Sequence, residues 1–203
     1  MTDEKIKVDK SESRDDSKKQ IREKAGTNNK FVIKTTDEFN KCVDHIYNLL
    51  NSGFILYDRG IYSSSNFFSI AAIEEIVKVY NALFSKDVDG YPGNGMGKKI
   101  FGPAYYLWMD DRLTDAVEEA DLKEIFDLYN SGYLVNLKNN SVYCQRRSDV
   151  MSLPADIVDQ KCARNMLLFA IQAYEDNIAG YSLYAINISK KTDKLFEAII
   201  GQE

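Results

Sequence analysis

The segment from Ser63 to Phe84 restricts most strongly how this chain can fold, because it reads as one long helix with apolar residues on two sides. Such residues recur at helical spacing along one side, and others gather on the opposite side. A helix that is apolar on two faces packs between neighbours. We therefore expect residues 63–84 to be the central, most buried helix. The first stripe contains Ile73, Ile76, Val77, Tyr80, Leu83 and Phe84, and the second Phe68, Ala71, Val79 and Ala82.

The same helix carries three charges near its middle, Glu74, Glu75 and Lys78. Glu74 and Lys78 stand four residues apart in the order that favours an ion pair on one helix. Glu75 points toward the second, partly apolar face. Two interpretations stay open. The charges form a solvated face with a structural ion pair between Glu74 and Lys78, or Glu75 and Lys78 lie in a functional cleft.

Composition indicates one all-α domain. The chain has 203 residues, is 44% hydrophobic and contains only 3 prolines. Its formal charge of -5 argues against a protein whose whole surface binds nucleic acid, so any such contact must be local. No apolar run is long enough for a membrane span and no secretory signal is evident, which predicts a cytoplasmic protein. The cysteines have no CxxC spacing and His45 is the single histidine, so we expect no metal and no cofactor.

The N-terminal segment, residues 1–30, is rich in charged residues and serine and has little to bury. We predict a charged arm there and a folded domain over residues 31–203. The domain should open with a helix, because Thr35 to Glu38 has the form of a capping box. Apolar residues continue from it at helical spacing to about Tyr57. The short break that follows makes this helix antiparallel to the central one.

A glycine-rich stretch follows the central helix and ends in Lys98 and Lys99. It departs from the phosphate-binding loop GxxxxGK[ST]: Pro92 stands where the first glycine belongs, Lys99 replaces Ser or Thr, and no strand precedes it. We interpret it as a loop with a basic end. Together with Arg146 and Arg147, these lysines are candidate RNA or phosphate contacts. The alternative is that both pairs are simply solvated.

Further helices are expected over residues 103–109 and from Thr114 to just before Gly132. Residues 133–153 look irregular, with a small hairpin turning at Asn139 and Asn140. Pro154 should open a last long helix, capped by Ser152, that runs to Asn177 or to Ile188. A short C-terminal helix then covers Leu195 to Ile200. The sequence thus predicts a bundle of about five helices with a small irregular or hairpin insertion.

The order of these features resembles the AbiV-type abortive infection proteins, a branch of the HEPN superfamily of prokaryotic defence proteins. The resembling positions are Ala71 to Lys78, Lys98 with Lys99, Val142 with Tyr143, and Pro154. The resemblance extends from about Phe39 to Tyr174. It implies a HEPN-like bundle that often forms a homodimer, and a toxin-like antiphage protein that halts RNA metabolism or translation, with a phage-encoded activator as a further partner. RNA, and not DNA, would be the target.

Many HEPN relatives are metal-independent endoribonucleases with an Arg-x4-6-His motif, which this sequence lacks, because no arginine precedes His45 at that spacing. His45 lies one position off the buried stripe of the first helix and remains a candidate acid or base beside Glu75 and Lys78. Two hypotheses follow. In the first, the chain is an RNA-targeting toxin, and cleavage would use these other groups. In the second, it is a non-catalytic interaction protein that binds a phage or translation component.

Overall fold

The computed structural model describes residues 31–84, 101, 105, 109–147 and 149–202. Three predictions therefore lie outside the described residues: the charged arm at 1–30, the glycine-rich loop with Lys98 and Lys99, and most of the helix expected over 103–109. The predicted division into an arm and a domain stays a prediction. The described residues are mainly helical, which confirms the all-α fold class.

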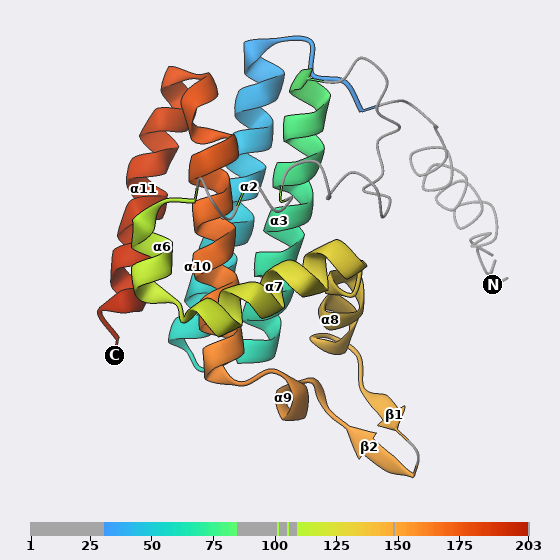
Figure 1. Ribbon diagram of the computed structural model, residues 1–203. Coiled ribbons are helices and arrows are strands. Elements are labelled where there is room, and N and C mark those ends of the chain that lie inside the picture. Colours follow the sequence, from blue (N-terminus) through green and yellow to red (C-terminus); the bar gives the residue numbers. More distant parts are fainter. Residues whose placement is uncertain (1–30, 85–100, 102–104, 106–108, 148, 203) are drawn as a thin grey trace, which may run out of the picture. The chain divides into compact units, whose positions relative to one another are not determined.

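Helices α2 (Thr36–Asp58) and α3 (Tyr62–Phe84) form the expected antiparallel hairpin (Figure 1). The hydroxyl of Thr35 caps α2 by accepting the amide of Glu38 at 3.2 Å. The Glu38 carboxylate accepts the amide of Lys34, at 2.7 Å, and not that of Thr35, so the box closes one residue earlier than the sequence indicates. The turn after α2 uses Gly60 at φ 73, a backbone conformation that glycine adopts without strain.

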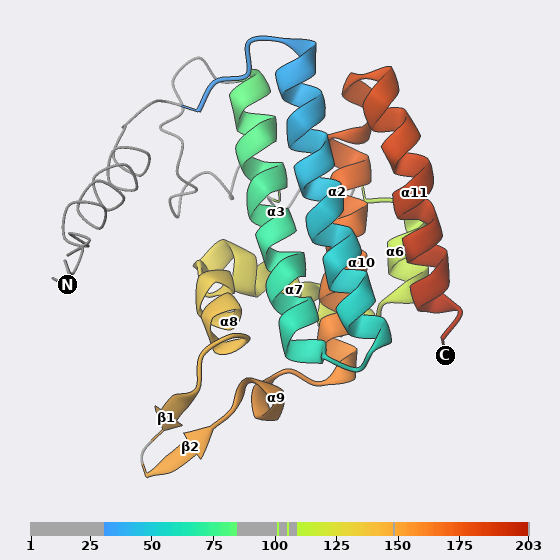
Figure 2. The same cartoon turned by 180° about the vertical axis from the view of Figure 1, so that it is seen from behind.

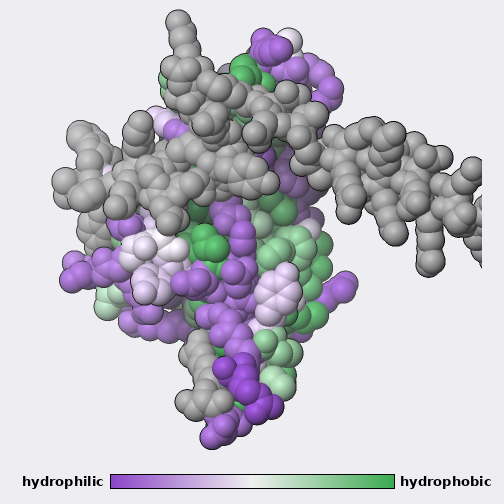
Figure 3. Space-filling view, turned by 90° about the vertical axis from the view of Figure 1, so that its right-hand side faces the viewer, coloured by the Kyte–Doolittle hydropathy of each residue, from purple (hydrophilic) through white to green (hydrophobic). Residues whose placement is uncertain are grey.

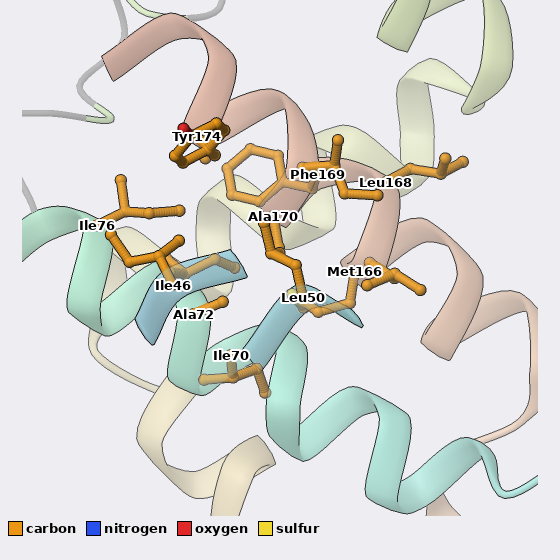
Figure 4. Close-up of a cluster of buried hydrophobic side chains, with 14 of the residues drawn as sticks. Ile46, Leu50, Ile70, Ala72, Ile76, Met166, Leu168, Phe169, Ala170 and Tyr174 are labelled. Carbon is orange, nitrogen blue, oxygen red and sulfur yellow. The ribbon is translucent and has the colours of Figure 1, made fainter. Parts of the chain in front are cut away.

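Helix α10 (Gln160–Asn177) packs against both α2 and α3, and these three helices enclose the core (Figure 4). Gly53 of α2 lies in contact with both of the other helices. A Cβ atom there would lie 3.2 Å from Leu167 Cδ1 of α10 and 3.4 Å from Ser69 Oγ of α3. Helix α11 (Leu183–Ile200) completes the bundle against α2 and α10 (Figure 2).

Helix α10 is the most buried helix, which corrects the expectation for α3. Every residue of α10 from Asn165 to Tyr174 is buried. Helix α3 is covered on the sides facing α2 and α10 but keeps one partly exposed face. Phe84, predicted in its buried stripe, is 59% exposed because it stands at the end of the helix. The partly exposed face contains Phe67, Phe68, Ala71, Glu74, Glu75, Lys78 and Ala82.

The helix predicted from Thr114 is instead two helices, α6 (Asp111–Ala116) and α7 (Glu119–Ser131). They are separated at Val117, which has an extended backbone and is only 3% exposed. Its burial in the core explains why the chain leaves helical geometry there. Gly132, at φ 79, ends α7 as predicted.

The predicted position of the hairpin is wrong. Asn139 and Asn140 lie in helix α8 (Leu134–Asn140), and the hairpin follows it as β1 (Gln145–Arg147) and β2 (Val150–Ser152). A buried hydrogen bond holds the end of α8 against the core: Asn66 Nδ2 of α3 donates to Ser141 Oγ, in the residue that follows α8, at 2.8 Å. The hairpin itself extends beyond α8 (Figures 1 and 2).

The C-terminal third is also divided differently from the prediction. Pro154 opens only a short helix, α9 (Pro154–Ile157), and Ser152 does not cap it. Asp159 caps α10 by accepting the amide of Cys162, and Ser182 caps α11 by accepting that of Ala185. A 3-10 turn, η1 (Ala179–Tyr181), separates α10 from α11, so the C-terminal helix is much longer than residues 195–200. In the part of the chain that is described, no helix is both long and apolar enough to cross a bilayer.

Candidate functional site at the α2–α3 seam

The charged residues of α3 pair differently from the prediction. Lys78 Nζ donates to both carboxylate oxygens of Glu75, at 3.1 and 3.2 Å. Glu74 instead accepts Lys138 Nζ of α8, at 2.7 and 2.6 Å. The predicted ion pair between Glu74 and Lys78 is therefore wrong. Lys78 reaches an acid at either three or four residues' distance on a helix, and the packing of α8 against α3 decided the choice.

The Glu75–Lys78 pair lies beside the first part of α2. Lys78 Nζ is 4.5 Å from the centroid of the Phe31 ring. Burial raises the pKa of the Cys42 thiol on α2 above its usual value; Glu75 raises it further and Lys78 opposes the shift. The side chains of Glu75 and Lys78 are each 26% exposed, so water reaches both.

His45 lies on the same helix as Cys42. It is exposed on α2, three residues after Cys42, which is about 4.5 Å along the helix axis. No hydrogen bond joins His45 to Glu75 or Lys78 within the described residues. We call the surface formed by Phe31, Cys42, His45, Glu75 and Lys78 the α2–α3 seam.

The predicted basic contacts are not brought to the seam. Lys98 and Lys99 lie outside the described residues. Arg146 is exposed on β1; Arg147 follows it in the same strand, and its side chain is not described. The hairpin that carries them extends beyond α8, away from α2 (Figures 1 and 2). Any RNA contact by Arg146 would thus be at a distance from Lys78 within one chain.

A polar cluster that sequence reasoning missed joins α6, α10 and α11. Arg112 Nε donates to Gln172 Oε1 at 3.0 Å, and its Nη1 donates to Asp193 at 2.7 Å. Asp176 accepts the Tyr105 hydroxyl and the Gln172 amide, both at 2.7 Å. Burial raises the pKa of Asp176, which these two hydrogen bonds oppose. Because the donors and acceptors satisfy one another, the cluster fastens the helices together.

A second missed group surrounds Glu175 of α10. Its carboxylate accepts the hydroxyl groups of Ser189 and Thr192 from α11. Burial nevertheless raises the pKa of Glu175, because the desolvation of the carboxylate outweighs both hydrogen bonds. The only signal in the sequence was a pair of acids at the end of an apolar helix, which did not reveal their partners.

A cleft of about 550 Å³ opens where α10 begins, beside the junction of α6 and α7. Lys161 crosses it to Glu118 at 3.1 Å and Asp121 at 2.9 Å, and Asn165 donates to Asp121 at 2.8 Å. Lys161 is therefore already neutralised by two acids and makes this cleft a poor site for RNA phosphate. Among the described residues, no three His, Cys, Asp or Glu side chains are grouped so that they could hold a metal ion.

Together, the hairpin of long helices and the third helix across it make an all-α bundle, consistent with a HEPN-like fold. The family model for AbiV matches residues 35–175, from the cap of α2 almost to the end of α10. Since this match covers more than half of the sequence, the chain belongs to the AbiV family of HEPN proteins, an abortive-infection family. Searches of curated proteins and of solved structures found no match.

Proposed function

We propose that this abortive-infection protein is a toxin-like effector that acts on RNA in phage-infected cells, as a metal-independent endoribonuclease working at the α2–α3 seam. One observation carries the proposal: the Glu75 carboxylate and the Lys78 ammonium group form a water-accessible ion pair on α3, which packs against α2, the helix on which His45 is exposed. Membership of the AbiV family supports the defence role. A phage-encoded activator would supply the trigger.

The three groups match the needs of RNA cleavage by its own 2′-hydroxyl. His45 is exposed, and its imidazole can accept the proton of the attacking 2′-hydroxyl. As the bond from the 2′-oxygen to phosphorus forms, the bond from phosphorus to the 5′-oxygen breaks, and the leaving 5′-oxygen takes a proton from water. Lys78 would stabilise the negative charge that develops on the phosphate, and Glu75 would hold the Lys78 ammonium group in place. Neither step needs a metal ion. Arg146 and Arg147, with Lys98 and Lys99, would bind phosphates elsewhere on the RNA, at a distance from the scissile bond.

The alternative function is a non-catalytic protein that binds a phage or translation component. The observation that favours it is the exposure of large apolar side chains along residues 133–153, such as Tyr133 at 59% and Tyr143 at 64%. Surfaces of this kind mark sites of protein interaction. Under this alternative the seam charges would serve only to fasten α3.

The test is incubation of the purified chain with total cellular RNA in the presence of a chelator, with and without a phage lysate as the source of activator. We expect discrete new fragments with 2′,3′-cyclic phosphate ends. Lys78→Ala and His45→Ala should each lower the cleavage rate at least about a hundredfold, the lower end of the range for loss of one catalytic group.

Lys41→Ala provides the matched control, because Lys41 is a lysine on α2 that is 73% exposed and pairs with Asp37 outside the seam. It should leave cleavage unchanged. Intact RNA with every preparation, alongside arrested protein synthesis, would instead establish the non-catalytic function. Cleavage that survives both seam substitutions would place the reaction elsewhere.

A further inference from the structure

Aromatic side chains from three elements meet at the end of the bundle where α2 begins and α3 ends (Figures 1 and 2). The Tyr181 ring, in the turn η1, has its centroid 5.3 Å from that of Phe84 on α3 and 6.4 Å from that of Phe39 on α2. Phe39 is buried, whereas Phe84 is 59% exposed and Tyr181 48%. Two exposed rings are thus held in place by a third that belongs to the core.

These rings line a pocket of about 340 Å³, within the range of small-ligand sites, which begins at about 300 Å³. We call it the aromatic pocket. Its other lining residues are Ile33, Lys34, Thr35, Thr36 and Leu83. By comparison, on the side of the molecule where α8 and the hairpin lie, hydrophobic side chains are scattered among hydrophilic ones (Figure 3). The aromatic pocket is therefore a concave surface suited to a flat, apolar group.

The pocket also favours a ligand that carries negative charge. Lys34 is exposed, and among the described residues that line the pocket it alone is charged. The two acids in the first turn of α2 already have partners. Asp37 pairs with Lys41 at 2.7 Å, and Glu38 accepts the backbone amide of Lys34 at 2.7 Å. The Lys34 ammonium group can pair with an anion that extends from the pocket. An aromatic group joined to an anion is the chemistry of a nucleotide.

A short segment joins the pocket to the α2–α3 seam. Ile33 lines the pocket, and Phe31, two residues earlier, has its ring centroid 4.5 Å from Lys78 Nζ. Two residues of chain span at most about 7 Å. Along α3, Lys78 and Phe84 are six residues apart, which is about 9 Å, roughly the length of three stacked nucleotides. A strand with a phosphate at Lys78 can thus place a nearby base in the pocket.

We propose that the aromatic pocket binds one unpaired base of the RNA, within about three nucleotides of the phosphate that lies at Lys78. The base stacks on the exposed face of Phe84 or Tyr181, and Lys34 pairs with a phosphate of the same strand. A base within a duplex is already stacked on both sides, so only an unpaired base can enter. The inference rests on the function proposed above, and it adds that the substrate is single-stranded beside the cleaved bond.

Binding of an RNA that cannot be cleaved tests the pocket separately from catalysis. The probe is a short fluorescent 2′-O-methyl RNA, which lacks the attacking hydroxyl, and its anisotropy is recorded as the full chain is added. Phe84→Ala and Tyr181→Ala should each weaken binding at least about fivefold, the lower end for loss of one stacked base. Phe84→Trp keeps a ring and should stay within about twofold of the wild type. Annealing the probe to its complement should abolish these differences between variants.

Tyr133→Ala is the matched control, because Tyr133 is also 59% exposed but lies in the connection between α7 and α8. It should leave binding of the probe unchanged. An abasic scan then locates the bound base. Removing the base should weaken binding to the wild type at least about fivefold at one position, within about three nucleotides of the cut in unmethylated RNA. The same abasic probe should cost Phe84→Ala less than about twofold, since the ring that stacks on this base is already absent.

Equal losses at that position in the wild type and in Phe84→Ala overturn the proposal, even if the chain cleaves RNA. Coupling between the abasic position and Phe84 in a chain that leaves RNA uncut supports the pocket and contradicts only the catalytic function of the seam. Binding of a phenylalanine-rich peptide in the pocket, with no binding of the RNA probe, would assign the pocket to a protein partner and likewise overturn the proposal.

Discussion

The three-helix core and the segment from Tyr133 to Leu153 differ in the contacts that stabilise them. In the core, α10 is buried over ten successive residues, from Asn165 to Tyr174, between α2 and α3. In the other segment, α8 is fastened to α3 but the β1–β2 hairpin has apolar side chains exposed on both faces. The core is thus stabilised by its own burial, whereas no residue that the structure describes covers the exposed side chains of the hairpin. The contrast predicts that substitutions in the core cost more unfolding free energy than substitutions in the hairpin.

The largest effect is expected when a large buried side chain is removed from the core. Phe169 is fully buried in α10 and packs against Phe101 and Phe126, with ring centroids 5.4 and 5.5 Å away. Phe169→Ala should lower the free energy of unfolding by about 3–5 kcal/mol, measured by urea denaturation. Met151→Ala in the hairpin should lower it by under about 0.5 kcal/mol. Equal losses of unfolding free energy from the two substitutions would contradict the proposed difference in stability between the core and the hairpin.

A smaller effect is expected at the link between the regions. Asn66→Ala removes the buried donor to Ser141 and should cost about 1–3 kcal/mol of unfolding free energy. Hydrogen exchange of the α8 amides should also become faster, because α8 loses a contact with α3. Asn48→Ala is the matched control, since Asn48 is exposed on α2. Unchanged exchange in α8 would show that the ion pair of Lys138 with Glu74 holds this helix alone.

The smallest effect is expected at Glu175 of α10. Burial raises the pKa of Glu175 above its usual 4.5, so the folded state binds a proton more readily than the unfolded state. This costs stability at neutral pH, and the cost disappears as the pH falls through the raised pKa toward 4.5. Glu175→Gln should therefore stabilise the fold at pH 7 by less than about 1 kcal/mol, with less gain in acid.

Thermal unfolding of the wild type and the Glu175→Gln variant at a series of pH values provides the measurement. A stabilisation that grows as the pH is lowered would contradict the assigned cause. Loss of stability at every pH would mean that the hydrogen bonds from Ser189 and Thr192 outweigh the desolvation of the carboxylate.

Much of the fold was predictable because it depends on local pattern. The apolar stripe of residues 63–84 and the cap at Thr35 predicted two antiparallel helices whose observed ends differ by one residue from the expected ones. The end of α7 before Gly132 was also predictable, because helices often end at a residue with left-handed backbone geometry, which glycine adopts readily. The boundaries around Val117 and Asn139 were wrong, because there burial against other helices overrides local preference.

The site was predictable only as a set of residue types. Lys78, Glu75 and Glu74 were identified from the sequence, but helix geometry alone allows Lys78 either acid. In the structure Lys138 of α8 forms an ion pair with Glu74, and Lys78 pairs with Glu75. The polar groups around Asp176 and Glu175 could not be found, since several of their partners lie on other helices, such as Arg112 of α6 and Ser189 of α11.

The sequence by itself determined the helical class, the α2–α3 hairpin and membership of the AbiV family, because periodicity, caps and family pattern are properties of contiguous residues. Only the tertiary structure decided which helix is central, which charges pair, and which aromatic rings meet at the end of the bundle. Those outcomes depend on contacts between residues far apart in the chain, whose free energies exist only once the helices have packed.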